Sequence, residues 1–260
     1  MIQSRHNRLI KQLRSLHSRS GREKLGLFLL EGVRLIEAAA DAELRLPYVV
    51  FNSYLESNQR GLELLARLQR QGSQVYQVAD RLLCELADTD RPQGILAAAE
   101  IPAEPAEWPE ASTILVLDGV QDPGNLGTLI RTADALGVDL IIALKGTVDP
   151  YNEKVVRAAM GSLFHLPLIQ NQEASDVLPR LREAGAQIVV SCLSPDAVPY
   201  LQAAYRDKVA LVVGNEGAGV SDLWLEEADQ RVIIPQRGAA ESLNVGVATG
   251  ILLAHISARF

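Results

Sequence analysis

The side chains best suited to chemistry lie in polar turns that follow apolar runs in the second half of the chain. Glu216 lies in the segment LVVGNEGAG, and Ser242 and Asn244 lie in IIPQRGAAESLNVGVATG. Each segment begins as an apolar run typical of a strand and continues into a glycine-containing turn. Two strands that end in flexible loops can bring a carboxylate, a hydroxyl and an amide to one ligand, where such groups orient substrates and assist proton transfer.

A third segment, DGVQDPGNLGTLIRTADALG, adds Asn125 and Arg131. Its apolar residues recur at helical spacing, so Asn125 falls at the start of a helix and Arg131 lies inside it, away from the apolar stripe. A guanidinium in such a place can hold a phosphate by two hydrogen bonds. Each residue also has an ordinary structural explanation: Asn125 as a helix cap, Arg131 as a partner of Asp134, and Glu216 as a charge at a helix start.

Several common classes of site are excluded by what the sequence lacks. The segment DGVQDPGNLG has the wrong glycine spacing for a dinucleotide fingerprint, and no GxxxxGK[ST] occurs. Cys84 and Cys192 form no CxxC and the histidines are scattered, so we expect neither a metal nor a disulfide framework. No apolar run approaches the length of a membrane span and the N-terminus does not resemble a signal peptide, which predicts a cytoplasmic protein.

The composition predicts a globular protein with two α/β domains. The chain has 260 residues, of which 48% are hydrophobic and 22% charged. Residues 100–112, EIPAEPAEWPEAS, resist both helix and sheet because of their prolines. We therefore expect a first domain over 1–103, a linker over 104–112 and a second domain over 113–260. Strands and helices alternate in the second domain, with one helix expected over 152–162, which predicts a mainly parallel sheet covered on both faces.

The net charge of −7 conceals a basic N-terminus. Spacings of three residues place four basic side chains along one side of a helix, and a fifth follows soon after. This strip could bind phosphates, or it could be a solvated helix face. Its members are Arg5, Arg8, Lys11, Arg14 and Arg22.

Together, the polar segments resemble the three motifs of the SpoU/TrmH family of RNA ribose 2′-O-methyltransferases. The matching stretches are NLGTLIRTA from Asn125, VGNEG from Val213, and IP from Ile234 together with SLNV from Ser242. This resemblance covers the chain from about Thr113 to its end. The N-terminal part, with the basic start and LLEGVRLIEAA, resembles the L30e-like substrate-binding domain of the family's ribosomal-RNA members.

The resemblance implies an S-adenosylmethionine (AdoMet)-dependent enzyme with an α/β-knot fold, which methylates a ribose 2′-hydroxyl in structured RNA. Ribosomal RNA of the 23S type is the expected substrate. The alternatives are transfer RNA, or a non-catalytic RNA-binding relative that acts in ribosome assembly. Members are similar in being homodimers packed through the knot, without a metal. Gln236 and Gly246 stand where many members have methionine and serine, which leaves the exact target open.

The same resemblance assigns roles to single positions. The catalytic residues it implies are Asn125, Arg131, Glu216, Ser242 and Asn244. The AdoMet-binding residues it implies are Cys192, Leu193, Gly214, Ile234 and Leu243. The basic strip becomes a candidate RNA-binding surface. Arg131 would take the central role, either as the base or, because guanidinium groups resist deprotonation, as a cation that grips a phosphate and stabilises an oxyanion.

Overall fold

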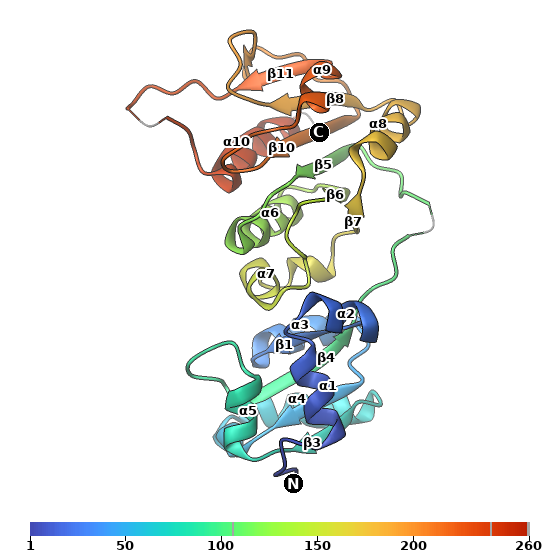
Figure 1. Cartoon of the computed structure of the whole chain (residues 1–260), viewed down its shortest axis with the longest axis vertical. Helices are drawn as coiled ribbons and strands as arrows, with labels where there is room; N and C mark the ends of the chain where they lie inside the picture. The colour runs from blue at the N-terminus through green and yellow to red at the C-terminus, as the bar shows by residue number, and fades with distance from the viewer. Residues whose placement is uncertain (106, 240, 259–260) are drawn as a thin grey trace. The chain divides into compact units, whose positions relative to one another are not determined.

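The computed structural model describes residues 1–105, 107–239 and 241–258 (Figure 1). Residues 106, 240, 259 and 260, which fall in the predicted linker and second domain, lie outside the described residues. The chain forms two compact units. The first comprises Met1–Ala103 and Tyr151–Phe164, and the second comprises Glu104–Pro150 and the chain from His165 onward.

The first unit is built on a mixed four-stranded sheet. Its strand order is β1 (Leu27–Glu31), β4 (Ile95–Glu100), β2 (Tyr48–Phe51) and β3 (Gln74–Gln77). β4 runs antiparallel to both of its neighbours, whereas β2 and β3 are parallel. The helices from the N-terminal part are α1 (Arg8–Ser15), α2 (Arg19–Leu25), α3 (Val33–Asp41), η1 (Ser53–Ser57), α4 (Gln59–Arg70) and α5 (Asp80–Leu86). α1 buries Leu9, Ile10 and Leu13 in the core of this unit, so its basic side chains point outward.

The segment 151–164 packs in the first unit, although the sequence pattern placed it in the second domain. It contains α7 (Glu153–Ala159) and η2 (Ser162–Phe164). The ring of Phe28 in β1 lies 5.0 Å from that of Tyr151 and 6.4 Å from that of Phe164. Because helical periodicity shows only that a helix has an apolar face, it could not show which sheet this face would cover.

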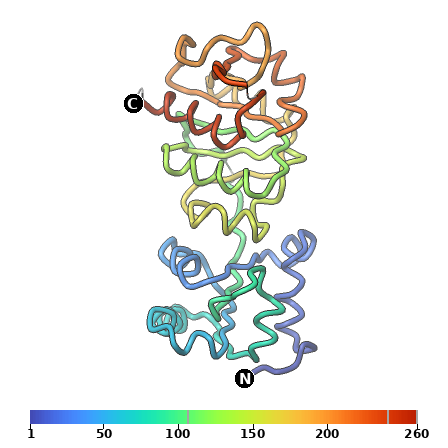
Figure 2. The backbone as a smooth tube through the Cα atoms, turned by 90° about the vertical axis from the view of Figure 1, so that its left-hand side faces the viewer, coloured from blue at the N-terminus to red at the C-terminus, as the bar shows by residue number. Residues whose placement is uncertain are grey.

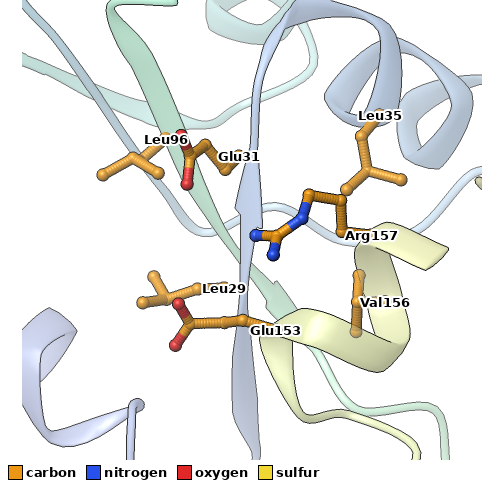
Figure 3. Close-up of a pocket in the computed structure, with 7 residues that line it drawn as sticks. All are labelled: Leu29, Glu31, Leu35, Leu96, Glu153, Val156 and Arg157. Carbon is orange, nitrogen blue, oxygen red and sulfur yellow. The ribbon is translucent and has the colours of Figure 1, made fainter. Parts of the chain in front are cut away.

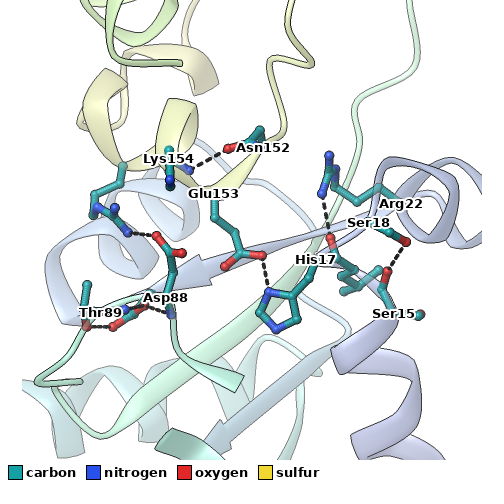
Figure 4. A network of polar contacts seen from close by, with 12 residues as sticks. Ser15, His17, Ser18, Arg22, Asp88, Thr89, Asn152, Glu153 and Lys154 are labelled. Carbon is teal, nitrogen blue, oxygen red and sulfur yellow. Dashed lines mark hydrogen bonds and ion pairs between the residues drawn. The ribbon is translucent and has the colours of Figure 1, made fainter. Parts of the chain in front are cut away.

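Two ion pairs add to this packing (Figure 4). His17 Nδ1 lies 2.7 Å from the Glu153 carboxylate, and Arg157 donates to Asp88 at 2.5 Å. Figure 3 shows the Arg157 side chain pointing into a small cavity beside Glu31. That cavity has a volume of about 10 Å³, room for about one water molecule, so it is not a ligand site.

The second unit contains a seven-stranded sheet in which every described pairing is parallel, which confirms the expected fold class. The strand order is β7 (Leu168–Gln172), β6 (Leu140–Leu144), β5 (Thr113–Asp118), β10 (Val209–Gly214), β8 (Gln187–Ser191), β11 (Gln230–Ile233) and β9 (Val198–Pro199). β7 and β9 were not predicted. β7 has the polar sequence LIQNQ and β9 has two residues, so neither carries a clear apolar pattern.

Helices cover both faces of this sheet. They are α6 (Pro123–Ala135), α8 (Ala174–Glu183), α9 (Asp222–Glu226) and α10 (Val245–Ser257). α8 and α9 pack into the core on one face, where Trp224 is fully buried. α10 packs against β10 and lies beside α6 on the other (Figure 2). In the described part of the chain, no helix has the length and apolar character needed to cross a membrane.

The contact between α6 and α10 explains one departure from the family pattern. A Cβ atom on Gly246 would lie 2.9 Å from Thr128 Cγ2, and one on Gly250 would lie 3.4 Å from Thr132 Cγ2. The two helices approach closely because these positions have no side chain. A serine at position 246 would therefore require Thr128 to move.

Candidate active site

An open cavity of about 810 Å³ lies in the second unit, where the chain leaves β8, β10 and β11 and enters α10. The carboxyl ends of parallel strands meet at one edge of a sheet, and ligands of open α/β sheets bind there. The lining comes from four segments. They are residues 191–194, residues 213–220, residues 233, 234 and 236, and residues 241–245 with 248 and 249; Asn125 and Leu225 complete the described lining.

The predicted AdoMet-binding residues all line this cavity. Cys192 and Leu193 follow β8, Gly214 ends β10, Ile234 follows β11, and Leu243 precedes α10. Three separate strand ends and one helix start therefore contribute to one space, whereas the apolar runs and polar turns predicted that two strand ends would meet there.

Most of the predicted catalytic residues line the same cavity. They are Asn125, Glu216, Ser242 and Asn244. Arg131 is exposed on α6 and is not among the described residues that line the cavity. The expected alternative for Arg131, a pair with Asp134, is wrong, because Asp134 lies 3.5 Å from His165 and makes no described ion pair with Arg131.

A chain of side-chain hydrogen bonds joins the three motifs. Asn244 Nδ2 donates to Asn125 Oδ1 at 2.8 Å, and Asn125 Nδ2 donates to Glu216 Oε1 at 2.9 Å. Asn244 also caps α10, because its Oδ1 accepts from the backbone N–H groups of Gly246 and Val247. The cap fixes Asn244, which in turn fixes the orientation of the Asn125 amide.

Glu216 is held by backbone donors as well. The N–H of Gln121 donates to Oε2 at 3.2 Å and that of Asp122 donates to Oε1 at 3.3 Å. Partial burial raises the pKa of Glu216, but the hydrogen bonds from Asn125 and from these backbone groups outweigh it and hold the pKa below its usual range. The side chain is therefore a carboxylate at neutral pH, which accepts hydrogen bonds and has no proton to donate.

Asp122, not Asn125, is the N-cap of α6. Its Oδ1 accepts from the backbone N–H of Asn125 at 2.8 Å. The capping explanation for Asn125 is thus wrong. The Asn125 side chain bonds only to other motif residues among the described partners, which supports a functional interpretation of this position.

The loop after β10 depends on close backbone approach and on Asn215. A Cβ atom on Gly214 would lie 2.2 Å from the carbonyl oxygen of Gly219, so only glycine fits there. Asn215 and Gly219 exchange two backbone hydrogen bonds of 2.9 and 3.0 Å. The Asn215 side chain donates to Gly119 O and accepts from the N–H groups of Gly217 and Ala218. Sequence reasoning missed Asn215, although an asparagine in a glycine-rich turn often bonds to the nearby backbone.

The candidate RNA-binding residues of the first unit fall into three groups. Arg5 and Arg14 both pair with Glu85, at 3.3 and 2.8 Å. Arg8 and Lys11 are exposed and make no described ion pair. Arg22 is only 3% exposed, and its guanidinium donates to Leu16 O at 2.7 Å. The prediction that Arg22 contacts RNA is therefore wrong, because its buried side chain stabilises the turn between α1 and α2.

Residues 112–254 match the SpoU rRNA Methylase family, and residues 7–97 match the MRM3-like substrate binding domain. The chain belongs to the SpoU rRNA methylase family. The resemblance that the three motifs suggested is confirmed, and the N-terminal match supports a substrate-binding role for the first unit.

Relatives of this SpoU protein resemble it along nearly its whole length. It is 38% identical over 255 residues to the 23S rRNA (guanosine(2553)-2′-O)-methyltransferase RlmP of Bacillus subtilis, covering 98% of both chains. It is 32% identical over 260 residues to the 23S rRNA (uridine(2479)-2′-O)-methyltransferase of Streptomyces viridochromogenes, covering 96% of this chain and 90% of that protein. The crystal structure of an AdoMet-bound rRNA methyltransferase from Sinorhizobium meliloti superposes with a TM-score of 0.87 at 33% identity, covering 99% of this chain and 96% of that one.

Proposed function

We propose that the protein transfers a methyl group from AdoMet to a ribose 2′-hydroxyl of 23S-type ribosomal RNA. The observation that carries this proposal is the hydrogen-bonded chain Asn244, Asn125 and Glu216, which brings three family motifs to one cavity. The relatives named above support the same reaction, since both are described as 23S rRNA 2′-O-methyltransferases.

The size and the lining of the cavity support AdoMet as the cofactor. Its volume of about 810 Å³ lies within the usual range for small-molecule sites, about 300–1,000 Å³. Leu193, Ile234 and Leu243 offer apolar surface for an adenine ring, and the backbone of the loop after Gly214 offers polar groups for its edges. Leu193 is 65% exposed, so a bound ring would cover apolar surface that otherwise faces water. When bound, AdoMet supplies a methyl group that its positively charged sulfur has already activated.

The residues of this chain then have to orient the acceptor and help its hydroxyl lose a proton. Asn125 uses one Nδ2 hydrogen and one Oδ1 lone pair within the motifs, so its second Nδ2 hydrogen and second lone pair remain for the substrate. Ser242 lines the cavity and makes no described hydrogen bond, which leaves its hydroxyl available to the RNA. Glu216 holds Asn125 in place as a carboxylate.

We assign Arg131 to the RNA side of the reaction. It is exposed and its side chain makes no described hydrogen bond or ion pair, so its guanidinium is available to an incoming phosphate. Two parallel hydrogen bonds to the phosphate beside the reacting ribose would fix the acceptor, and the positive charge would stabilise the oxygen as it loses its proton. This role needs no deprotonation of Arg131.

A second copy of the chain is proposed to cover α10. Val247 is 52% exposed, and Ile251 and Ala254 follow it at intervals of four and three residues on one stripe of the helix. Apolar residues at these intervals suit a homodimer packed through the knot region, and light scattering measures the resulting mass. The knot itself stays a prediction.

Ribosomal RNA is preferred over transfer RNA because the first unit matches a substrate-binding domain and carries basic side chains in an otherwise acidic protein. Within the predicted basic strip, Arg8 and Lys11 are exposed and make no described ion pair. Bacterial ribosomal RNA is transcribed and assembled into ribosomes in the cytoplasm, where we place the protein.

The substrate is tested by incubating the protein with methyl-labelled AdoMet and either 23S rRNA or tRNA. The proposal expects label in 23S rRNA. Label only in tRNA would contradict the substrate assignment, and AdoMet binding without transfer to either RNA would favour the non-catalytic alternative.

A further inference from the structure

We propose that Thr147 is a positioning residue for Glu216 and acts through the turn Asp118–Asp122. This inference rests on the proposed function, because it gives Thr147 a part in building the same catalytic site. Thr147 follows β6 and is not among the described residues that line the cavity. Its effect must therefore pass through the residues that it holds.

The backbone of the turn Asp118–Asp122 forms hydrogen bonds with the side chains of Glu216 and Asn215. The N–H groups of Gln121 and Asp122 donate to the Glu216 carboxylate, and the carbonyl of Gly119 accepts from the Asn215 side chain at 2.8 Å. The turn also sets the start of α6, since Asp122 is the cap of that helix. Its position thus determines where Asn125 and Glu216 meet.

Thr147 also holds this turn by hydrogen bonds. Its hydroxyl donates to Leu117 O at 3.0 Å and accepts from Gly119 N–H at 3.2 Å, so it bridges the last residues of β5 and the first residues of the turn. The next residue, Val148, donates its backbone N–H to Val120 O at 2.8 Å. One side-chain hydroxyl and one backbone group therefore hold the first half of the turn.

Because residue 119 is a glycine, the conformation of the turn depends on the hydrogen bonds from Thr147 and Val148. Its φ of +74° lies in the left-handed region that glycine adopts easily, so its own backbone preference does little to hold the turn in one conformation. The two backbone bonds to Glu216, at 3.2 and 3.3 Å, are already near the long end for N–H···O contacts. A small rotation at Gly119 would therefore release Glu216 and, with it, the fixed amide of Asn125.

The experiment compares three single variants with the wild-type chain. Thr147→Val removes the hydroxyl but keeps the shape of the side chain, and Thr147→Ser keeps the hydroxyl. Thr113→Val is the matched control, because this threonine lies in the same unit, at the start of β5 and away from the turn, and its hydroxyl makes no described hydrogen bond. Circular dichroism checks folding, and Thr147→Ala replaces Thr147→Val if that variant does not fold.

Two readouts separate positioning from a general loss of structure. The first is the pKa of the Glu216 carboxyl, measured by NMR titration of protein with ¹³C-labelled glutamate. The second is kcat and KM for methyl transfer to 23S rRNA. We expect Thr147→Val to move the Glu216 pKa up toward its usual value and to lower kcat about tenfold, with KM changed by less than about twofold. Thr147→Ser and Thr113→Val should stay within about twofold of the wild type.

An unchanged Glu216 pKa and kcat in Thr147→Val would overturn the inference, as would an equal loss in Thr147→Ser. A wild-type protein that transfers no methyl group would instead contradict the proposed function. In that case the titration of Glu216 still decides whether Thr147 positions it.

Discussion

Replacing Gly214 by alanine gives the sharpest structural prediction. The new Cβ would lie 2.2 Å from the carbonyl oxygen of Gly219, 2.3 Å from its carbonyl carbon and 2.4 Å from the nitrogen of Val220. These are backbone atoms, so no side chain can rotate away. Because non-bonded carbon and oxygen atoms normally stay more than about 3.2 Å apart, the loop must shift by about 1 Å.

The magnitude follows from what that shift disrupts. Overpacking of this kind costs about 1–3 kcal/mol. The shift also breaks the two backbone hydrogen bonds between Asn215 and Gly219, each worth about 1 kcal/mol net. The free energy of unfolding should fall by roughly 3–5 kcal/mol, a large part of the 5–15 kcal/mol that is typical of a folded protein. AdoMet affinity should fall as well, because the displaced loop lines the cavity.

Gly217→Ala is the matched control in the same loop. A Cβ there would meet only Asn215 Oδ1, at 3.6 Å, which is an ordinary contact. Urea denaturation gives the free energy of unfolding of each variant, and calorimetry gives its AdoMet affinity. If Gly214→Ala and Gly217→Ala have the same free energy of unfolding and the same AdoMet affinity, the close approach of Gly219 to Gly214 is not needed for the fold or for the site.

Three further substitutions test other parts of the structure. Arg131→Ala should abolish methyl transfer while AdoMet affinity and melting temperature stay unchanged, since the side chain is exposed and makes no described contact; near-normal turnover would contradict its role. Replacing Arg8 and Lys11 by alanine should lower the salt dependence of RNA binding by about one to two units of log–log slope, and an equal slope would make them a solvated face. The hydrogen bond that His17 Nδ1–H donates to the Glu153 carboxylate raises the pKa of His17, so this pair contributes fully below the unfolded-state pKa of about 6.5 and loses its contribution as pH rises through the folded-state pKa. Glu153→Gln should therefore destabilise the protein at about pH 5.5 and much less at about pH 9 in urea denaturation, and a pH-independent loss would refute the linkage.

The family resemblance located the cavity residues because its motifs are short, local stretches of sequence. Gly214, Ile234 and Leu243 lie in the motif stretches that resemble the SpoU/TrmH family, and the structure places them at strand ends or before a helix, where parallel strands bring their carboxyl ends together. The motif spacing then identified Asn125 and Glu216, which the structure joins by a hydrogen bond.

The features that sequence reasoning missed depend on contacts between distant parts of the chain. Nothing in the spacing of Arg22 shows that its guanidinium turns inward to Leu16 O rather than outward. Thr147 bonds to residues about thirty positions earlier, so no local pattern marks it. The choice of Asp122 over Asn125 as the cap of α6 depends on which side chain the other motifs already hold.

The most direct test of the central claim is to map the modified nucleotide. 23S rRNA is incubated with the protein and methyl-labelled AdoMet, digested to nucleosides and analysed by mass spectrometry. A ribose methyltransferase of this family is expected to place the label on the 2′-oxygen of one nucleotide. A label on a base, or no label in RNA despite AdoMet binding, would contradict the reaction proposed for this site.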